Sequence, residues 1–290
     1  MSAVRTLEVP GYQVLEFVGS GARSTIWQVK DRAGRLCALK RVVRRQPSDY
    51  RFLEQVINEF EVASRCDHPV VRKVYRLVRI RHWLAVREVH LFMEWCVGQT
   101  VHDLRPTDIR ETVRIYQAVA EGLAHINARG FVHADTKPNN IVVAPDGSVK
   151  LIDMGQSCTL GTVKERIQGT PDFIAPEQVH RMALDARTDA YNFGASLYWA
   201  LTGRAIPTIL PREHRGNLRS EYVVVPPEKI NDQVPASLSK LVAECVEMNP
   251  SQRPESMALV ASRLGLIAHS LELRRNGNGN GNGGNWNENK

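Results

Sequence analysis

The sequence has little of what several large classes of protein require. It contains five cysteines among 290 residues, widely spaced and without a C-x-x-C pair, which argues against a disulfide framework or a zinc site. The N-terminal MSAVRTLEVP lacks the apolar core of a signal peptide, and the most apolar run, residues 193–201, is too short to cross a bilayer. We therefore expect a cytoplasmic protein without a membrane partner.

The basic residues form no nucleic-acid motif. Lys and Arg number 38 against 31 Asp and Glu, a net charge of +7, but they are scattered and are not interleaved with aromatic residues. This excess suits anionic ligands such as nucleotides, and we expect no nucleic-acid partner. With 43% hydrophobic and 24% charged residues, the composition is typical of a globular protein with a substantial core.

What the sequence does contain is a stretch, residues 131–155, with two aspartates in distinctive settings. Asp135 lies in H-x-D-x-K-x-x-N, and Asp153 lies in D-M-G. Two apolar runs between them are joined by Pro-Asp-Gly, which predicts a β-hairpin that holds both carboxylates in fixed relation. Together with Lys137 and Asn140 they suit a divalent metal on a polyphosphate, although each aspartate alone would more often cap a turn.

Residue patterns divide the chain into a strand-rich first part and a helical second part. Alternating apolar residues predict strands, and apolar residues spaced by three and four predict helices. Residues 276–290 form a Gly/Asn tract that is predicted to be disordered. The predicted strands are 12–19, 25–31, 35–43, 74–80 and 86–95, and the predicted helices are 51–65, 112–129, 176–181, 188–202, 237–248 and 256–270.

In its motifs and their order, the sequence resembles the eukaryotic-type protein kinases, in the Ser/Thr branch that bacteria also possess. The resemblance covers residues 11–268, after an N-terminal extension of residues 1–10. It implies an α+β, two-lobed protein-kinase fold. A small antiparallel β-sheet lobe with one helix would span about residues 11–95, and a larger, mainly α-helical lobe about 99–268. It also implies ATP and Mg²⁺ (or Mn²⁺) as cofactors and protein substrates with Ser/Thr acceptors.

The nucleotide would lie between the lobes. Residues 19–26 resemble the glycine-rich G-x-G-x-x-G-x-V loop, with Ser24 in place of the third glycine. Lys40 ends a segment that resembles the V-A-I-K strand, Glu59 is its implied partner, and Met93 is the implied gatekeeper. The residues implied to bind ATP are Gly19, Ser20, Gly21, Ala22, Ser24, Ile26, Ala38, Lys40, Met93, Glu94, Cys96 and Val142.

Residues 133–140 resemble the kinase catalytic loop. The resemblance implies that Asp135 orients the substrate hydroxyl and accepts its proton, and that Lys137 balances charge on the γ-phosphate. Asn140 and Asp153 would hold the metal ion. A lysine two residues after the catalytic aspartate is the Ser/Thr-kinase form of this loop. The catalytic residues are thus predicted to be Asp135, Lys137, Lys40 and Glu59.

Residues 169–177, GTPDFIAPE, resemble the peptide-binding end of the activation segment. Three sets of contacts are implied in this region. They are Thr170 with Asp135 and Lys137, Glu177 with Arg253 as a buried ion pair, and Asp189 with the backbone of the catalytic loop.

Three departures from the family pattern bear on regulation and specificity. Ala134 replaces the arginine that usually grips a phosphorylated activation-segment residue, and Arg166 occupies the expected phosphorylation position. We hypothesise that activity does not require phosphorylation of this segment. Met154 replaces Phe in D-F-G and is expected to fill the same apolar slot. A strongly basic substrate motif is not expected, since the positions that carry carboxylates in arginine-directed kinases are Thr100, Asn139 and Trp199.

Two alternatives are weighed against an active protein kinase. A catalytically weak pseudokinase acting as a nucleotide-binding scaffold is favoured only by Ser24 and Ala134. A small-molecule phosphotransferase is disfavoured by GTPDFIAPE and by the helix that begins near Asp189, which together build a peptide-binding shelf. Phosphate transfer from Mg-ATP to a generic protein separates the first alternative from a kinase.

Overall fold

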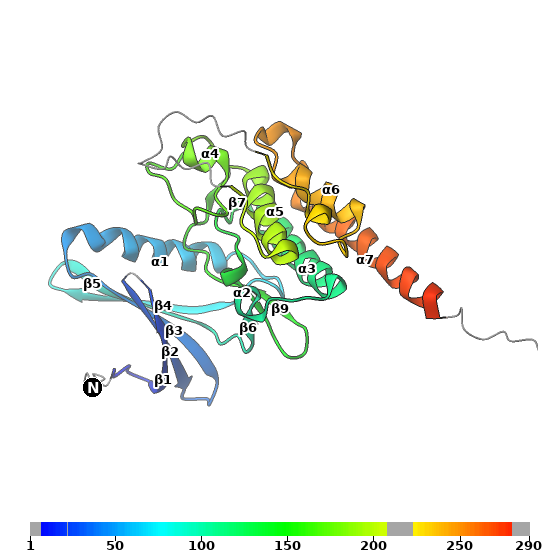
Figure 1. The fold of residues 1–290 in the computed structure, drawn as a ribbon. Helices are drawn as coiled ribbons and strands as arrows, with labels where there is room; N and C mark the ends of the chain where they lie inside the picture. Colours follow the sequence, from blue (N-terminus) through cyan, green and yellow to red (C-terminus); the bar gives the residue numbers. More distant parts are fainter. Residues whose placement is uncertain (1–6, 22, 208–222, 280–290) are drawn as a thin grey trace, which may run out of the picture.

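The computed structural model describes residues 7–21, 23–207 and 223–279, and the described part folds into the two predicted lobes (Figure 1). The first lobe is an antiparallel sheet with helix α1 packed on it. The second is mainly helical. The α+β fold class expected from the sequence is therefore confirmed. Within the described ranges, no helix combines the length and apolarity needed to span a membrane.

The sheet of the first lobe has the strand order β1-β2-β3-β5-β4. Its hairpins form where turn residues separate alternating runs. Between β2 and β3, the Asp31 carboxylate accepts from the amides of Ala33 and Arg35, and Gly34 takes φ 84°. The strands are β1 Tyr12–Ser20, β2 Ser24–Asp31, β3 Leu36–Val43, β4 Val74–His82 and β5 Ala85–Glu94.

Helix α1, Tyr50–Ala63, crosses the sheet and follows the short 3-10 turn η1, Pro47–Asp49. Leu53, Val56 and Val62 are buried on its sheet-facing side. Glu59 lies three residues from Val56 and Val62, so the helical repeat turns its carboxylate toward the sheet with them. An acidic residue is thereby carried into the space between the lobes.

The second lobe is built around α3, Ile109–Ala128, and α5, Ala186–Thr202. Both helices begin earlier than predicted because an aspartate caps each start. Asp108 accepts from the Arg110 amide, and Asp185 accepts from the Arg187 amide. The other helical elements are α2 Val101–Leu104, η2 Pro138–Asn140, α4 Pro176–Val179, η3 Pro227–Lys229, α6 Ala236–Cys245, η4 Pro250–Gln252 and α7 Met257–Gly279.

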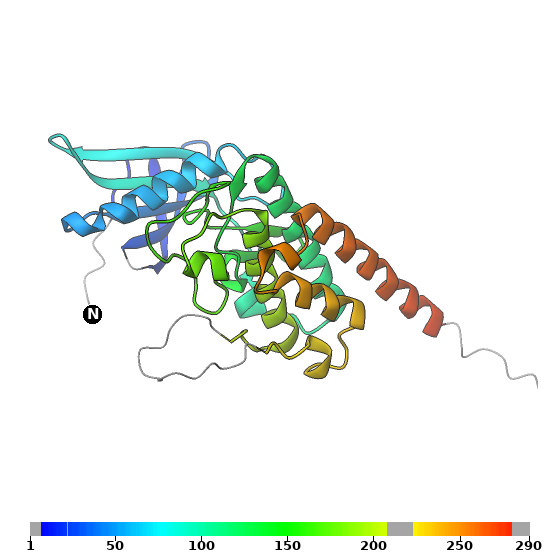
Figure 2. The ribbon, with the colours of Figure 1, turned by 90° about the horizontal axis from the view of Figure 1, so that it is seen from above.

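Helices α3, α5, α6 and α7 share one apolar core (Figure 2). Tyr116 of α3 packs edge-on against Phe193 of α5 and donates its hydroxyl to the Ser196 carbonyl at 2.9 Å. Helix α7 runs past residue 268, the predicted end of the domain, and includes the first four residues of the predicted disordered tail. An established helix adds residues at little cost, so it can continue into residues of poor propensity. Residues 280–290 lie outside the described residues.

The predicted two-aspartate hairpin is present. Strands β8, Ile141–Val143, and β9, Val149–Leu151, pair antiparallel, and Gly147 takes φ 81° in the turn between them. Strand β6, Gln99–Thr100, pairs with β8. A smaller sheet joins β7, Phe131–Val132, with β10, Cys158–Thr159. These short strands hold the segment before Asp135 and the segment after Asp153.

Candidate active site

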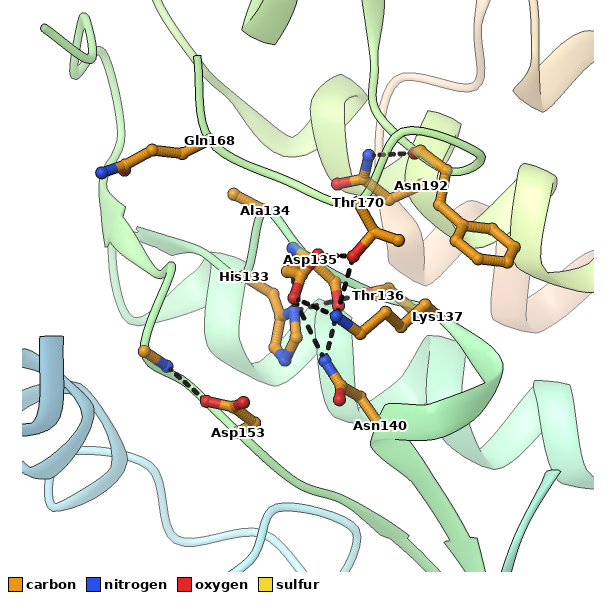
Figure 3. Close-up of polar contacts among 12 residues, drawn as sticks. His133, Ala134, Asp135, Thr136, Lys137, Asn140, Asp153, Gln168, Thr170 and Asn192 are labelled. Carbon is orange, nitrogen blue, oxygen red and sulfur yellow. Dashed lines mark hydrogen bonds and ion pairs between the residues drawn. The ribbon is translucent and has the colours of Figure 1, made fainter. Parts of the chain in front are cut away.

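Asp135 lies at the centre of a hydrogen-bonded cluster on the catalytic loop (Figure 3). Lys137 Nζ donates to Asp135 Oδ2 at 2.9 Å and to Thr170 Oγ1 at 2.8 Å, and Thr170 Oγ1 donates to Asp135 Oδ1 at 3.0 Å. The predicted contacts of Thr170 are therefore present. They join the catalytic loop to the end of the activation segment around one carboxylate, which is 8% exposed.

Asn140 is oriented by the same loop. Its amide nitrogen donates to the Asp135 carbonyl at 2.9 Å, which directs the amide oxygen away from that bond. Asp153 has φ 68°, a left-handed backbone conformation that costs energy for a non-glycine residue and is concentrated at functional sites. Its Oδ1 accepts from the Gly155 amide at 3.2 Å. A carboxylate and an amide oxygen are donors that Mg²⁺ accepts, so Asp153 and Asn140 could hold that ion.

The backbone under Asp135 is held by Asp189 at the start of α5. Asp189 is fully buried and accepts from the amides of His133 at 3.0 Å and Ala134 at 2.9 Å, as predicted. Asn127 donates to the same carboxylate at 2.7 Å. Burial raises the pKa of Asp189, while the neighbouring His133 and the two amides oppose that rise. Burial lowers the pKa of His133, which favours the neutral imidazole.

Opposite this loop, Lys40 of β3 bridges two carboxylates. Its Nζ lies 2.7 Å from Glu59 Oε2, the predicted partner, and 3.3 Å from Asp153 Oδ1. Burial by itself would lower the pKa of Lys40, but the charges of Asp153 and Glu59 outweigh burial and raise it. The Lys40 ammonium is also the main cause that lowers the pKa of Asp153. Both groups are therefore charged at neutral pH.

A cavity of about 230 Å³ lies between these two groups of residues. Its polar lining includes three cationic side chains and both aspartates, and Ser24 of the predicted glycine-rich loop also lines it. Cations suit phosphate oxygens, and Asp153 could supply a metal ligand beside them. The charged lining residues are Arg23, Lys40, Lys137, Asp135 and Asp153.

The residues predicted to bind the nucleotide lie on adjoining strands. Gly19 pairs with Ile26, Ser20 pairs with Thr25, and the Gly21 amide donates to the Ser24 carbonyl. The remaining predicted positions are in β3, β5, β8 and the segment after β5. Ala38 pairs with Met93, Val142 is buried in β8, Glu94 ends β5, and Cys96 follows it, whereas Ala22 lies outside the described residues.

The predicted ion pair under the peptide-binding segment is also present. Arg253 Nη1 and Nη2 bind the two oxygens of Glu177 at 2.7 and 3.0 Å, and both residues are buried. Arg253 further donates to the backbone carbonyls of Glu247, Arg187 and Met248, so all parts of the guanidinium are used. This bidentate pair fixes α4 onto the helical lobe.

A family model described as a protein kinase domain matches residues 12–264 of the chain. The chain belongs to the protein kinase family. The chain is 30% identical over 271 residues to serine/threonine-protein kinase PknL of Mycobacterium tuberculosis, a match that covers 90% of this chain and 67% of that protein. It is 27% identical over 294 residues to serine/threonine-protein kinase A of Synechocystis, covering 91% of this chain and 54% of that protein.

A probable serine/threonine-protein kinase of Clostridium acetobutylicum is 24% identical over 275 residues, with 89% of this chain and 40% of that protein covered. This kinase-family chain thus spans between 40% and 67% of the length of these three curated relatives. All three are bacterial, and all three carry a serine/threonine-kinase name.

Arg72 is a residue of this kinase-family site that the sequence did not single out. It follows the buried pair Val70 and Val71, and its Nη2 lies 3.1 Å from Glu59 Oε1. Glu59 therefore has a cation on each carboxylate oxygen, Lys40 on one and Arg72 on the other. An arginine directly after two valines was the available signal, but the sequence did not show which way its side chain turns.

The activation segment is fastened by side chains that bind backbone carbonyls. Gln178 Nε2 donates to Ala134 O at 2.8 Å and to Gln168 O at 3.1 Å, so one amide joins the catalytic loop to the segment. Lys164 Nζ donates to Gln156 O at 2.6 Å, and Asn58 of α1 donates to Ser157 O at 2.7 Å. The sequence did not predict these contacts, because this glutamine, lysine and asparagine belong to none of the recognised motifs.

Proposed function

We propose that this chain is an ATP-dependent serine/threonine protein kinase that uses Mg²⁺ or Mn²⁺. The observation that carries the proposal is the Asp135–Lys137–Thr170 cluster facing Lys40 and Asp153 across one cationic cavity. The names of the bacterial relatives support the serine/threonine class. The acceptor would be a protein, since the segment that contains Thr170 and Glu177 supports a peptide-binding surface.

In the proposed reaction, Asp135 holds the substrate hydroxyl and receives its proton as the oxygen forms a bond to the γ-phosphorus. The bond between that phosphorus and the β–γ bridging oxygen breaks, and ADP leaves. Lys137 and Lys40 offset the negative charge on the transferred group and on the remaining phosphates. Mg²⁺ bound by Asp153 and Asn140 would neutralise the phosphate oxygens. Positioning and charge compensation supply most of the catalysis, so a strong base is not needed.

The test is phosphate transfer from radiolabelled Mg-ATP to casein, followed by phosphoamino-acid analysis. The wild-type chain should label serine or threonine, whereas Asp135→Asn and Lys40→Met should lose at least about a hundredfold in rate while remaining folded. Asp232→Asn, which changes an exposed aspartate outside the site, is the matched control and should match wild type. Equal labelling by Asp135→Asn would refute the catalytic assignment. Absence of labelling by the wild-type chain, together with ATP binding, would favour a scaffold.

We also propose that the activation segment works without phosphorylation. Ala134 has no guanidinium to bind a phosphate, is 1% exposed and packs against Val132 and Leu184. The link that a phosphate would otherwise make is supplied by Gln178 between Ala134 O and Gln168 O. The Arg166 side chain at the expected phosphorylation position cannot accept a phosphate on a hydroxyl. These contacts support a segment held by hydrogen bonds of unmodified side chains rather than by a phosphate.

Gln178 offers a direct test of this second proposal. Gln178→Leu removes both bonds at similar volume, and with them the two bonds that Gln178 Oε1 accepts from the Ala175 amide and from Asn192. It should lower kcat by about tenfold, because the buried carbonyls lose their donor and the two buried donors lose their acceptor. If a phosphate normally secured the segment, phosphatase-treated wild type would fall to the level of Gln178→Leu. If Gln178→Leu keeps full activity, the amide does not secure the segment.

A further inference from the structure

The hairpin between β4 and β5 carries an apolar tip that the fold does not cover. Every residue from Arg79 to Ala85 is exposed, and Trp83 and Leu84 at the turn are 89% and 94% exposed. Figures 1 and 2 show this hairpin extending beyond the sheet at the end of the lobe where α1 begins. Large apolar side chains exposed together commonly mark an interaction site.

The turn conformation adds to this observation. Trp83 has φ 57°, a left-handed conformation that glycine or asparagine adopts at lower cost than tryptophan. Its ring makes no aromatic or cation–π contact with any of the described residues. Neither packing nor backbone geometry within the described lobe therefore explains a tryptophan here. A partner outside the described lobe that binds the side chain would explain it.

The surroundings of the tip are positively charged. Arg79, Arg81 and Arg87 on the hairpin are exposed and form no ion pair with the described residues. Arg45 and Arg51, which lie before β4 in the sequence at the start of α1, are also exposed and without an ion pair to that part of the chain. The acidic groups at this end are Asp49, which binds Arg23, Glu88, which binds Arg41 and His90, and Glu54 and Glu61, which share a groove with Arg79 and Arg81.

We infer that this hairpin tip docks on an anionic lipid surface. Tryptophan is favoured at the membrane interface, a neighbouring leucine can enter the acyl boundary, and each arginine near an anionic surface strengthens attraction about fivefold. Docking of this kind is peripheral and reversible, and it needs no membrane-spanning helix. It differs from the expectation, drawn from the sequence, that the chain has no membrane partner.

Two other occupants fit the tip less well. A stable protein interface buries about 800 Å² on each partner, far more than two side chains at a hairpin turn provide. A symmetric pair of chains would also bring two arginine-rich tips together, and like charges repel. Single-stranded nucleic acid needs aromatic rings for stacking, whereas Leu84 has none beside the one tryptophan.

The experiment is vesicle flotation of the full chain with phosphatidylcholine alone or mixed with phosphatidylglycerol. Wild type should float with the anionic vesicles and be released by salt. Changing Trp83→Ala with Leu84→Ser should weaken partitioning about tenfold, and Arg79→Gln with Arg81→Gln about twentyfold. Matched controls on α7, Leu266→Ser and Arg274→Gln, also remove an exposed leucine and an exposed arginine and should bind as wild type does.

All hairpin variants should keep the wild-type unfolding midpoint and kinase rate, so a loss of binding cannot be assigned to misfolding. Failure of the wild-type chain to float with anionic vesicles would overturn the inference. Equal losses in the α7 controls would do the same, because they would show unspecific adsorption. Dimer dissociation or loss of nucleic-acid retention on changing Trp83, without an effect on vesicles, would assign the tip to those partners instead.

Discussion

Arg72 provides the sharpest test of how helix α1 is held in place. The Glu59 side chain is 2% exposed, with Lys40 2.7 Å from one oxygen and Arg72 3.1 Å from the other. Arg72→Leu places an apolar side chain in a site where the arginine side chain is only 14% exposed. The substitution removes the donor to Glu59 Oε1. Helix α1 then depends on Lys40 alone for its charged contact with the strands.

The size of the effect follows from the burial of Glu59. Removing the sole partner of a buried charge costs about 3–5 kcal/mol, but Glu59 keeps its contact with Lys40. The cost is therefore that of one hydrogen bond to a charged group, about 1.5–3 kcal/mol, and we place it near the lower end. If that cost falls on the conformation in which Glu59 meets Lys40, a loss of ~1.4 kcal/mol lowers the equilibrium constant for forming it about tenfold. The competent population falls by a similar factor where that conformation is not strongly favoured in the wild type. We therefore expect kcat/KM to fall about tenfold, with a smaller change in the unfolding midpoint.

The assay is steady-state phosphorylation of one peptide by purified variants at matched ATP concentrations. Arg72→Lys restores a cation without the planar guanidinium and should recover part of the loss. Arg76→Leu removes an exposed arginine from the neighbouring strand, where it forms no ion pair with the described residues, and should be neutral. The reasoning is refuted if Arg72→Leu stays within twofold of wild type, or if Arg76→Leu loses as much.

Two further predictions concern the helical lobe. Glu177→Gln leaves the fully buried Arg253 guanidinium without its carboxylate, which should cost about 3–5 kcal/mol and lower Tm by about 10 °C in a thermal melt; a shift under 2 °C would contradict this. Gly194→Ala would place a Cβ 2.5 Å from Cys245 Cβ and should destabilise by about 1–3 kcal/mol in urea unfolding, whereas Gly265→Ala, with its nearest neighbour at 3.5 Å, should not destabilise.

Local chemistry in the sequence predicted the elements that position the site. Pro-Asp-Gly between two apolar runs predicted the β8–β9 hairpin, and the spacing of apolar residues predicted α1 and α3. The contacts between distant segments, such as Glu177 with Arg253, came from the family resemblance, because no local pattern relates residues 76 apart. The starts of α3 and α5 were missed because their capping aspartates lie outside the apolar repeat.

The contacts that the sequence did not predict depend on the direction in which individual side chains point. Arg72 donates a hydrogen bond to Glu59, and Gln178 donates one to the Ala134 carbonyl. Arginine and glutamine occur in many settings, so the residue type alone did not predict either contact. Strand β4 extends two residues beyond its predicted end at residue 80, which carries the hairpin and Trp83 away from the sheet. The predicted pattern of strands contained both β4 and β5, but the exposure of the turn between them is visible only in three dimensions.

The measurement that tests the account most directly is the initial rate of a chain from which all phosphate has been removed. Phosphatase treatment, with mass spectrometry to verify that residues 153–177 are unmodified, should leave most of the wild-type rate from the first turnover. The rate should also show no lag. A collapse of activity that recovers only after incubation with Mg-ATP would contradict an activation segment held by Gln178 and its neighbours.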